Sequence, residues 1–133
     1  MSNASAAARP TEFDDWLAAM VLRHGEFTIL VILTAIGKGK VTPLRSTFLH
    51  VIGDEVDWAQ IKIMFESAGR DWDGAAFFPT KASEGGPVDN ATARQRLTEL
   101  QDKVREDRMV LNEGHFFDTF GRRIEIEPLA DAP

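Results

Sequence analysis

Ten consecutive residues, 27–36, form the most apolar stretch of the chain. Six of them are β-branched, and such side chains favour strands because they pack well on a pleated surface. Polar and apolar residues do not alternate here, which is typical of a strand covered on both faces. A buried helix is the alternative, since a continuous apolar run has no period that separates the two. The stretch is far shorter than the roughly 20 residues of a membrane span, so we expect no membrane segment.

A second strand is predicted over 41–52, antiparallel to the first. Pro43 cannot donate a backbone hydrogen bond, so the start of this strand is expected at a sheet edge. The connecting residues, 37–40, read Gly-Lys-Gly-Lys and resemble a phosphate-binding loop in composition. Their spacing matches neither a Walker A loop nor a dinucleotide-binding loop, and we interpret them as a turn.

Capping residues and helical periodicity indicate two helices in the first half of the chain. One is predicted over 12–24, where Thr11 and Asp14 have the spacing of a capping box and Gly25 follows the last turn. The next begins after Asp57, which is placed to cap it. Its predicted apolar stripe comprises Trp58, Ile61, Phe65 and Ala68, widened by Ile63 and Met64.

A third helix is predicted over 90–107, with Asn90 as its cap. Glu99 and Lys103 have the spacing of an ion pair on one helix face. All other positions outside a narrow stripe are polar, so one face is expected to pack and the rest to be solvated. The stripe consists of Ala93, Leu97, Leu100 and Val104.

The remaining segments are predicted to be short strands, over 75–78, 109–111, 115–120 and 124–126, with Pro79 ending the first of them. The whole pattern predicts an α+β fold, in which about three helices pack mainly on one face of a mixed, mostly antiparallel sheet.

A single domain is expected over 10–127. The flanking residues are interpreted as a disordered, tag-like N-terminus over 1–9 and a frayed tail over 128–133.

Composition excludes several classes of protein. Cysteine is absent, which removes disulfide scaffolds, cysteine nucleophiles and cysteine-ligated metal sites. The formal net charge is −6, and residues 54–90 alone carry eight acidic and three basic side chains. We therefore expect no nucleic-acid partner, because affinity for phosphates depends on clustered Lys and Arg. A cytoplasmic location follows by elimination, since no signal peptide is recognised.

The candidate binding surface combines aromatic and charged side chains from two predicted turns. Aromatic residues beside arginine are typical of interaction hot spots. The alternative for the aromatic residues is burial in the core of a twisted hairpin, and for the two aspartates a polar turn. The candidate residues are Asp71, Trp72, Asp73, His115, Phe116, Phe117, Arg122 and Arg123.

The leading hypothesis is a small, soluble, non-catalytic domain that binds a protein partner, with no cofactor. A metal-dependent hydrolase is the second, built from Asp71, Asp73, His115 and a C-terminal glutamate, because carboxylates and imidazole bind divalent cations. The third is an acidic partner that neutralises a basic protein, suggested by the charge of 54–90.

Overall fold

A computed structural model describes residues 10–37, 39–53, 56–67 and 71–126 of the chain. The predicted termini, 1–9 and 128–133, lie outside the described residues. Within the described part the helices are α2 (Glu12–His24), α3 (Trp58–Glu66), α4 (Asn90–Glu106) and the short 3-10 helix η1 (Arg108–Glu113); the strands are β1 (Phe27–Gly37), β2 (Lys40–Val51), β3 (Gly74–Thr80) and β4 (His115–Asp118).

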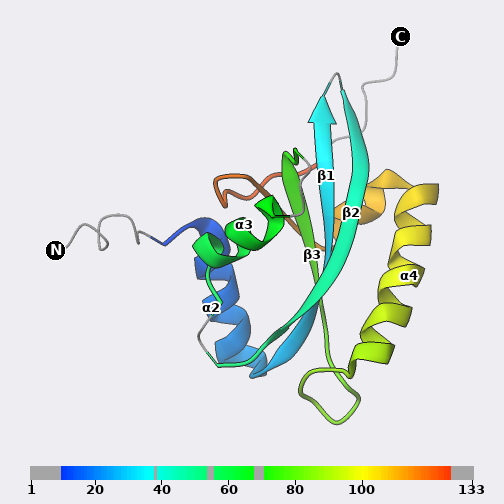
Figure 1. Cartoon of the computed structure of the whole chain (residues 1–133). Coiled ribbons are helices and arrows are strands. Elements are labelled where there is room, and N and C mark those ends of the chain that lie inside the picture. Colours follow the sequence, from blue (N-terminus) through cyan, green and yellow to red (C-terminus); the bar gives the residue numbers. More distant parts are fainter. Residues whose placement is uncertain (1–9, 38, 54–55, 68–70, 127–133) are drawn as a thin grey trace, which may run out of the picture.

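The four strands form one antiparallel sheet in the order β2-β1-β3-β4 (Figure 1). β1 lies between β2 and β3, and the hairpin between β1 and β2 turns at Gly39, whose φ of 72° suits glycine. β2 is an edge strand, as Pro43 predicts, and a register shift opposite Leu33 and Thr34 marks a bulge in this pair. The prediction of an antiparallel strand pair is confirmed.

Both faces of β1 are buried, which explains its unbroken apolar sequence. Ile29, Val31 and Leu33 pack on the face covered by α2 and α3, whereas Leu30 and Ile32 pack on the face covered by α4 (Figure 1). Two helices thus share one face, and the third covers the other. The fold is a single α+β domain, as predicted, and its core is split by the sheet into two layers.

Helices α2 and α3 begin where their caps predict. Thr11 and Asp14 form the complete capping box of α2, and Asp57 accepts a hydrogen bond from the backbone of Gln60 at the start of α3. The predicted widening of the α3 stripe is wrong, because the exposed fractions of Ile63 and Met64 are 69% and 46%. The remaining predicted member, Ala68, lies outside the described residues.

Helix α4 buries the four predicted stripe residues against the sheet. Its cap is Asp89 and not Asn90: the Asp89 side chain accepts from the backbone of Thr92, while Asn90 Oδ1 accepts from His50. The predicted Glu99–Lys103 pair is not formed. Asp102 and Arg105 make the ion pair of this helix instead, at 3.1 Å.

The C-terminal third differs most from the sequence-based prediction. Residues 109–111 belong to η1 and not to a strand, because Asp107 caps this helix by accepting from Met109. β4 ends at Asp118. In the described residues that follow, strand pairing is limited to an isolated bridge between Arg123 and Phe117. The predicted strand over 124–126 is therefore not formed.

Pro79 was expected to end β3 but lies inside it, paired with Ile29. β4 pairs only with residues 74–77 of β3, so beyond Phe77 one side of β3 has no partner strand among the described residues. A residue without a backbone N–H is tolerated at such a position.

Candidate functional site

The aromatic residues of the predicted binding surface belong to the core. Trp72 is buried and packs edge-on against Phe65, with ring centroids 5.4 Å apart. Phe116 and Phe117 are also buried, on opposite faces of the sheet, because successive residues of a strand point to opposite sides. These three side chains stabilise the fold and are not on the surface.

The two turns that carry the predicted residues do lie at the same end of the sheet. Pairing of β3 with β4 places Gly74, which follows Asp73, opposite Asp118. Asp73 is committed to this turn: its carboxylate accepts from the backbone of Ile36 at 2.7 Å, and its own N–H donates to Thr34. Asp71 is exposed.

The turn that follows β4 is built around Asp118. The Asp118 carboxylate accepts from the backbone of Phe120 and of Arg122, and it pairs with the Arg122 guanidinium at 2.9 Å. This arrangement leaves the ring of Phe120 with an exposed fraction of 64%. Phe120 is therefore the exposed aromatic residue of this segment.

His115 stacks on Trp16, with ring centroids 4.7 Å apart, and its Nδ1 accepts from the guanidinium of Arg123 at 3.2 Å. Burial lowers the pKa of His115, and the nearby positive charge of Arg123 lowers it further. The imidazole is thus held in its neutral form. Arg123 in turn lies over the ring of Phe117, at 4.9 Å from its centroid.

The four side chains of the hydrolase hypothesis do not come together as a metal site. Among the residues that the structure describes, no three His, Asp or Glu side chains are close enough to hold a metal ion. Asp73 and His115 are engaged separately, by Ile36 and by Arg123. Of the two C-terminal glutamates, Glu127 lies outside the described residues.

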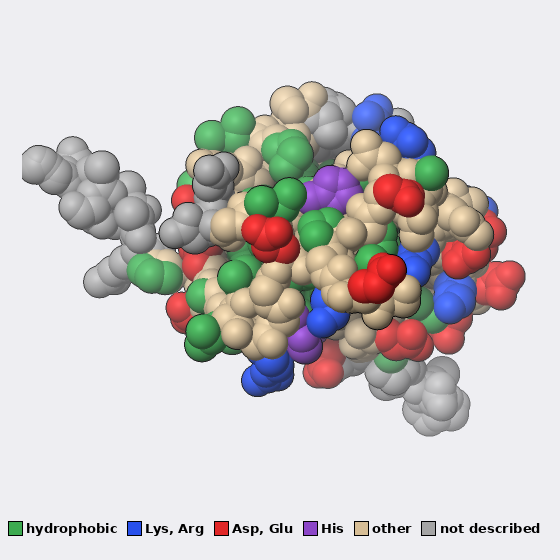
Figure 2. Space-filling model, turned by 90° about the horizontal axis from the view of Figure 1, so that it is seen from below, with side chains coloured by type: hydrophobic (Ala, Val, Ile, Leu, Met, Phe, Trp, Pro, Cys, Tyr) green, Lys and Arg blue, Asp and Glu red, His purple; other side chains and the backbone are tan. Residues whose placement is uncertain are grey.

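Several carboxylates of the acidic segment also have structural partners. Asp57 and Asp89 cap α3 and α4, and Asp73 closes the end of β1. On the face shown in Figure 2, acidic and basic side chains are intermixed. The charge of 54–90 is therefore spread over three separate helix and strand ends, and it does not form one described acidic surface.

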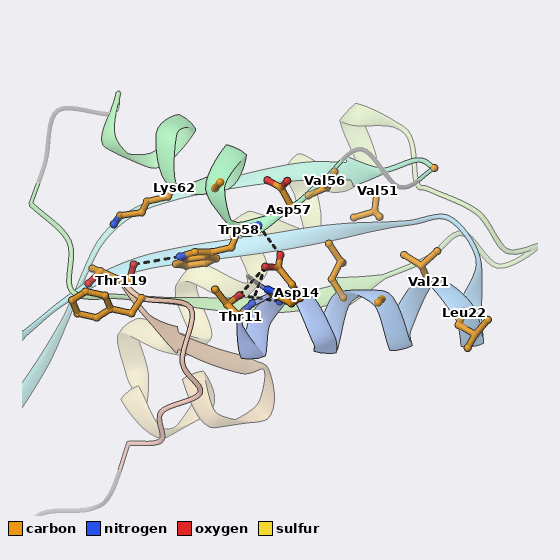
Figure 3. Close-up of a pocket in the computed structure, with 16 residues that line it drawn as sticks. Thr11, Asp14, Val21, Leu22, Val51, Val56, Asp57, Trp58, Lys62 and Thr119 are labelled. Carbon is orange, nitrogen blue, oxygen red and sulfur yellow. Dashed lines mark hydrogen bonds between the residues drawn. The ribbon is translucent and has the colours of Figure 1, made fainter. Parts of the chain in front are cut away.

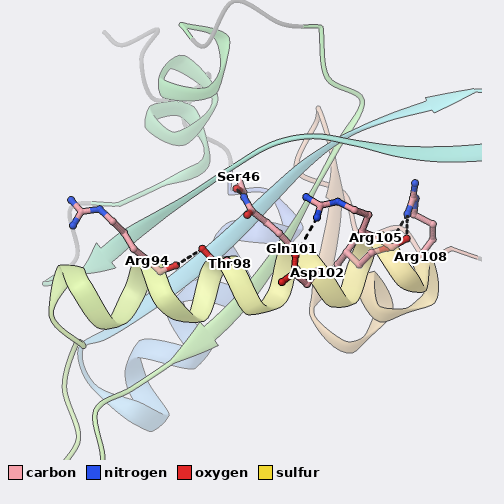
Figure 4. A network of polar contacts seen from close by, with 8 residues as sticks. Ser46, Arg94, Thr98, Gln101, Asp102, Arg105 and Arg108 are labelled. Atoms are coloured by element: carbon pink, nitrogen blue, oxygen red, sulfur yellow. Dashed lines mark hydrogen bonds and ion pairs between the residues drawn. The ribbon is translucent and has the colours of Figure 1, made fainter.

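The polar side of α4 is tied to β2 (Figure 4). Gln101 of α4 donates to the Ser46 hydroxyl, and Arg94 of the same helix lies over the ring of Phe48, 6.0 Å from its centroid. Arg108, the first residue of η1, donates to the backbone carbonyl of Val41 at 3.1 Å. These contacts hold α4 and η1 on the sheet.

A cleft of about 930 Å³ lies between α2 and α3 (Figure 3). This volume is within the range of protein ligand sites. Lys62 and Thr119 lie at one end of the cleft and Leu22 at the other. Its apolar wall includes Leu17, Ala18, Val21, Val51, Val56 and Ala59.

Polar groups in the middle of this cleft are already hydrogen-bonded. Asp14 accepts from the backbone and hydroxyl of Thr11 with one carboxylate oxygen and from the backbone of Trp58 with the other. The Trp58 indole N–H donates to the carbonyl of Thr119, and Asp57 caps α3. These groups hold the helix starts together and shape the cleft.

The exposed ends of the cleft are apolar and aromatic. Leu22 has an exposed fraction of 90%, and Phe120 lines the opposite end. The Lys62 ammonium and the Arg122 guanidinium lie 5.9 Å and 4.9 Å from the centroid of the Phe120 ring. Sequence reasoning missed this site. The one available signal is that α2 carries the apolar side chains Ala18 and Leu22 in addition to its buried residues, which are Phe13, Trp16 and Leu17.

Comparison with protein-family models, with curated proteins and with solved structures finds no match to this chain. Within the described residues, no helix is long and apolar enough to cross a membrane.

Proposed function

We propose that this protein is a non-catalytic binding domain, and that the cleft between α2 and α3 receives an apolar segment of another protein. The observation that carries the proposal is the open apolar cleft with Leu22 and Phe120 exposed at its two ends. Burial of such side chains is the main favourable term in protein association. The proposal keeps the interaction function expected from the sequence and moves its surface from the β4 turn to the cleft.

Binding is favoured over catalysis by the state of the polar side chains. A catalytic acid, base or nucleophile needs a free position next to a substrate. Asp14, Thr11 and Asp57 each bind helix N–H groups, and such caps stabilise the helices that they begin.

The exposed side chains at the two ends of the cleft, Leu22 and Phe120, form its rim and favour a protein partner over a small ligand. A small molecule inside the cleft would leave Leu22 almost fully exposed, whereas a protein segment covers both the cleft and its rim. Exposed apolar patches of this kind mark protein interaction sites. The lack of a nucleic-acid partner remains part of the proposal, supported by the excess of acidic residues. A cytoplasmic location also remains part of it, as an expectation from the sequence.

The experiment uses two matched variants of the full chain. Ala18 and Ala19 are both exposed on α2, but Ala18 lines the cleft and Ala19 does not. The probe is a synthetic amphipathic peptide of about twelve residues with one Leu-rich face and no net charge. Its binding is measured by titration calorimetry and by intrinsic tryptophan fluorescence, since Trp58, one of the three tryptophans, lines the cleft.

We expect the native chain and the Ala19→Arg variant to bind the peptide equally, and the Ala18→Arg variant to lose binding at least ten-fold, about 1.4 kcal/mol. Equal binding by all three proteins, or none by the native chain, would contradict the proposal. Thermal unfolding of both variants is the control, since Ala and Arg have similar helix propensities.

A further inference from the structure

The side chains at the two ends of the cleft indicate the conformation and charge of the bound segment. This inference rests on the proposed function. We propose that the segment is an amphipathic α-helix with a carboxylate side chain at one end of its apolar stripe. That carboxylate pairs with Lys62 beside Phe120, while the other end of the stripe covers Leu22.

A helix fits this cleft better than an extended peptide. Two walls of the cleft are the helices α2 and α3, whose first backbone N–H groups are bound by the caps Thr11, Asp14 and Asp57. An extended segment would bury backbone N–H and C=O groups against apolar side chains without partners, which is unfavourable. A helix satisfies its own backbone and needs only an apolar face.

The length of the apolar wall sets the length of the helix. Thr11 and Leu22 both line the cleft and lie on the same side of α2. Eleven residues of helix rise roughly 16 Å, which is about three turns. The bound stripe therefore has apolar residues at about four positions, spaced three and four residues apart.

Charge decides the orientation of the helix. Lys62 lines the cleft and forms no ion pair with any residue in the described ranges. Arg122, on the other side of the Phe120 ring, is already paired with Asp118 at 2.9 Å. Lys62 is thus the cation that is available to a ligand at this end.

Acidic groups exclude the carboxylate from the centre of the cleft. Asp14 and Asp57 both line the cleft there, each bound to helix N–H groups. A ligand carboxylate next to them would be repelled, whereas the same group beside Lys62 is attracted. The Lys62 ammonium lies 5.9 Å from the centroid of the Phe120 ring, which places an aromatic surface beside the attracting cation.

The test compares three peptides that differ at one position, the last of the apolar stripe, which carries Glu, Gln or Lys. We expect the Glu peptide to bind the native chain about three-fold to ten-fold more tightly than the Gln peptide, and the Lys peptide to bind most weakly. Lys62→Gln abolishes the difference between Glu and Gln. Lys103→Gln, on the exposed side of α4, is the matched control and leaves the difference intact.

Salt separates the ion pair from the apolar contact. At about 0.5 M NaCl the preference for Glu falls, while binding of the Gln peptide persists. If the native chain binds all three peptides with equal affinity and the Ala18→Arg variant binds none of them, this inference is wrong and the proposed function stands. No binding of any peptide overturns both.

Other occupants give different results. If dodecanoate binds in place of the peptides, with the same dependence on Lys62, the cleft is a site for a small amphiphile. That result would contradict the proposal that its occupant is a helix. Sedimentation of the native chain as a dimer, reversed by Ala18→Arg and not by Ala19→Arg, would show that a second copy fills the cleft.

Discussion

The carboxylate of Asp14 joins the N-termini of two helices: its Oδ1 accepts a hydrogen bond from the backbone N–H of Trp58 at 2.8 Å, although the two residues are 44 positions apart. Its Oδ2 completes the capping box of α2 with Thr11. One side chain thus holds the start of α2 against the start of α3 and sets the geometry of the cleft between them.

Replacement of Asp14 by alanine is therefore expected to destabilise the protein by about 2 kcal/mol, since a helix cap and a second charged hydrogen bond are lost together. Urea denaturation measures the change. Asp15→Ala is the control, because Asp15 is exposed in the same turn; its effect is expected within about 0.5 kcal/mol. A similar loss in both variants would assign the effect to helix charge and not to the link with Trp58.

Thr28 is fully buried and links three segments. Its hydroxyl accepts from the backbone of Val88 at 3.1 Å and lies 2.8 Å from His50 Nδ1. On its other side the His50 ring bonds Asn90, with Nε2 donating to Oδ1 at 2.8 Å.

Thr28→Val keeps the shape of the side chain and removes both hydrogen bonds. We expect a destabilisation of about 1–3 kcal/mol, because a buried backbone N–H loses its partner. Thr47→Val, at a half-buried position of β2, serves as the reference. Equal stability of Thr28→Val and the native chain in guanidinium denaturation would show that water replaces the lost hydroxyl.

Gly121 requires glycine for two reasons. Its φ is 74°, and an added Cβ would lie 2.8 Å from the side chain of Thr11. Gly86 has a φ of 82° but open space around it. Gly121→Ala is thus expected to lower stability more than Gly86→Ala, which carries only the backbone strain of about 1 kcal/mol. The midpoints of thermal unfolding test this order, and the reverse order would refute the close approach.

The stability of the protein is expected to fall when the solution is acidified from about pH 7 to about pH 5. The pKa of His115 is lowered in the folded state, so the unfolded chain binds more protons below the ordinary pKa of 6.5. The contribution of His115 is therefore present above that pH and is lost as the pH falls through its folded pKa. Denaturation of His115→Gln over the same range should show a smaller decrease, and an unchanged decrease would assign it to other groups.

Elements of this fold that depend on neighbouring residues could be predicted from the sequence. Thr11, Asp14 and Gly25 define α2 within a few positions, and the bounds of β1 follow from its β-branched run. The turn at Asp118 follows equally from local chemistry, since its carboxylate binds backbone groups two and four residues away. Helix caps, turns and strand propensity depend on residues that are close in sequence, so they can be predicted from the sequence.

Other features could not be predicted because they depend on distant partners. Pro79 stays within β3 because β4 is too short to reach it. Phe116 and Phe117 are buried on separate faces because helices cover both sides of the sheet. Residues 109–111 are as apolar as a short strand, but the Asp107 cap makes them part of η1.

Side-chain patterns within short stretches were enough to predict the α+β class, the central strand covered on both faces and the starts of α2 and α3. The position of the exposed apolar surface depends instead on how the helices pack on the sheet. The cleft exists because Asp14 reaches Trp58 and because Phe120 lies beside Lys62, and both contacts join residues from separate parts of the chain. Such contacts have no local signature, because the packing of helices on a sheet brings their partners together.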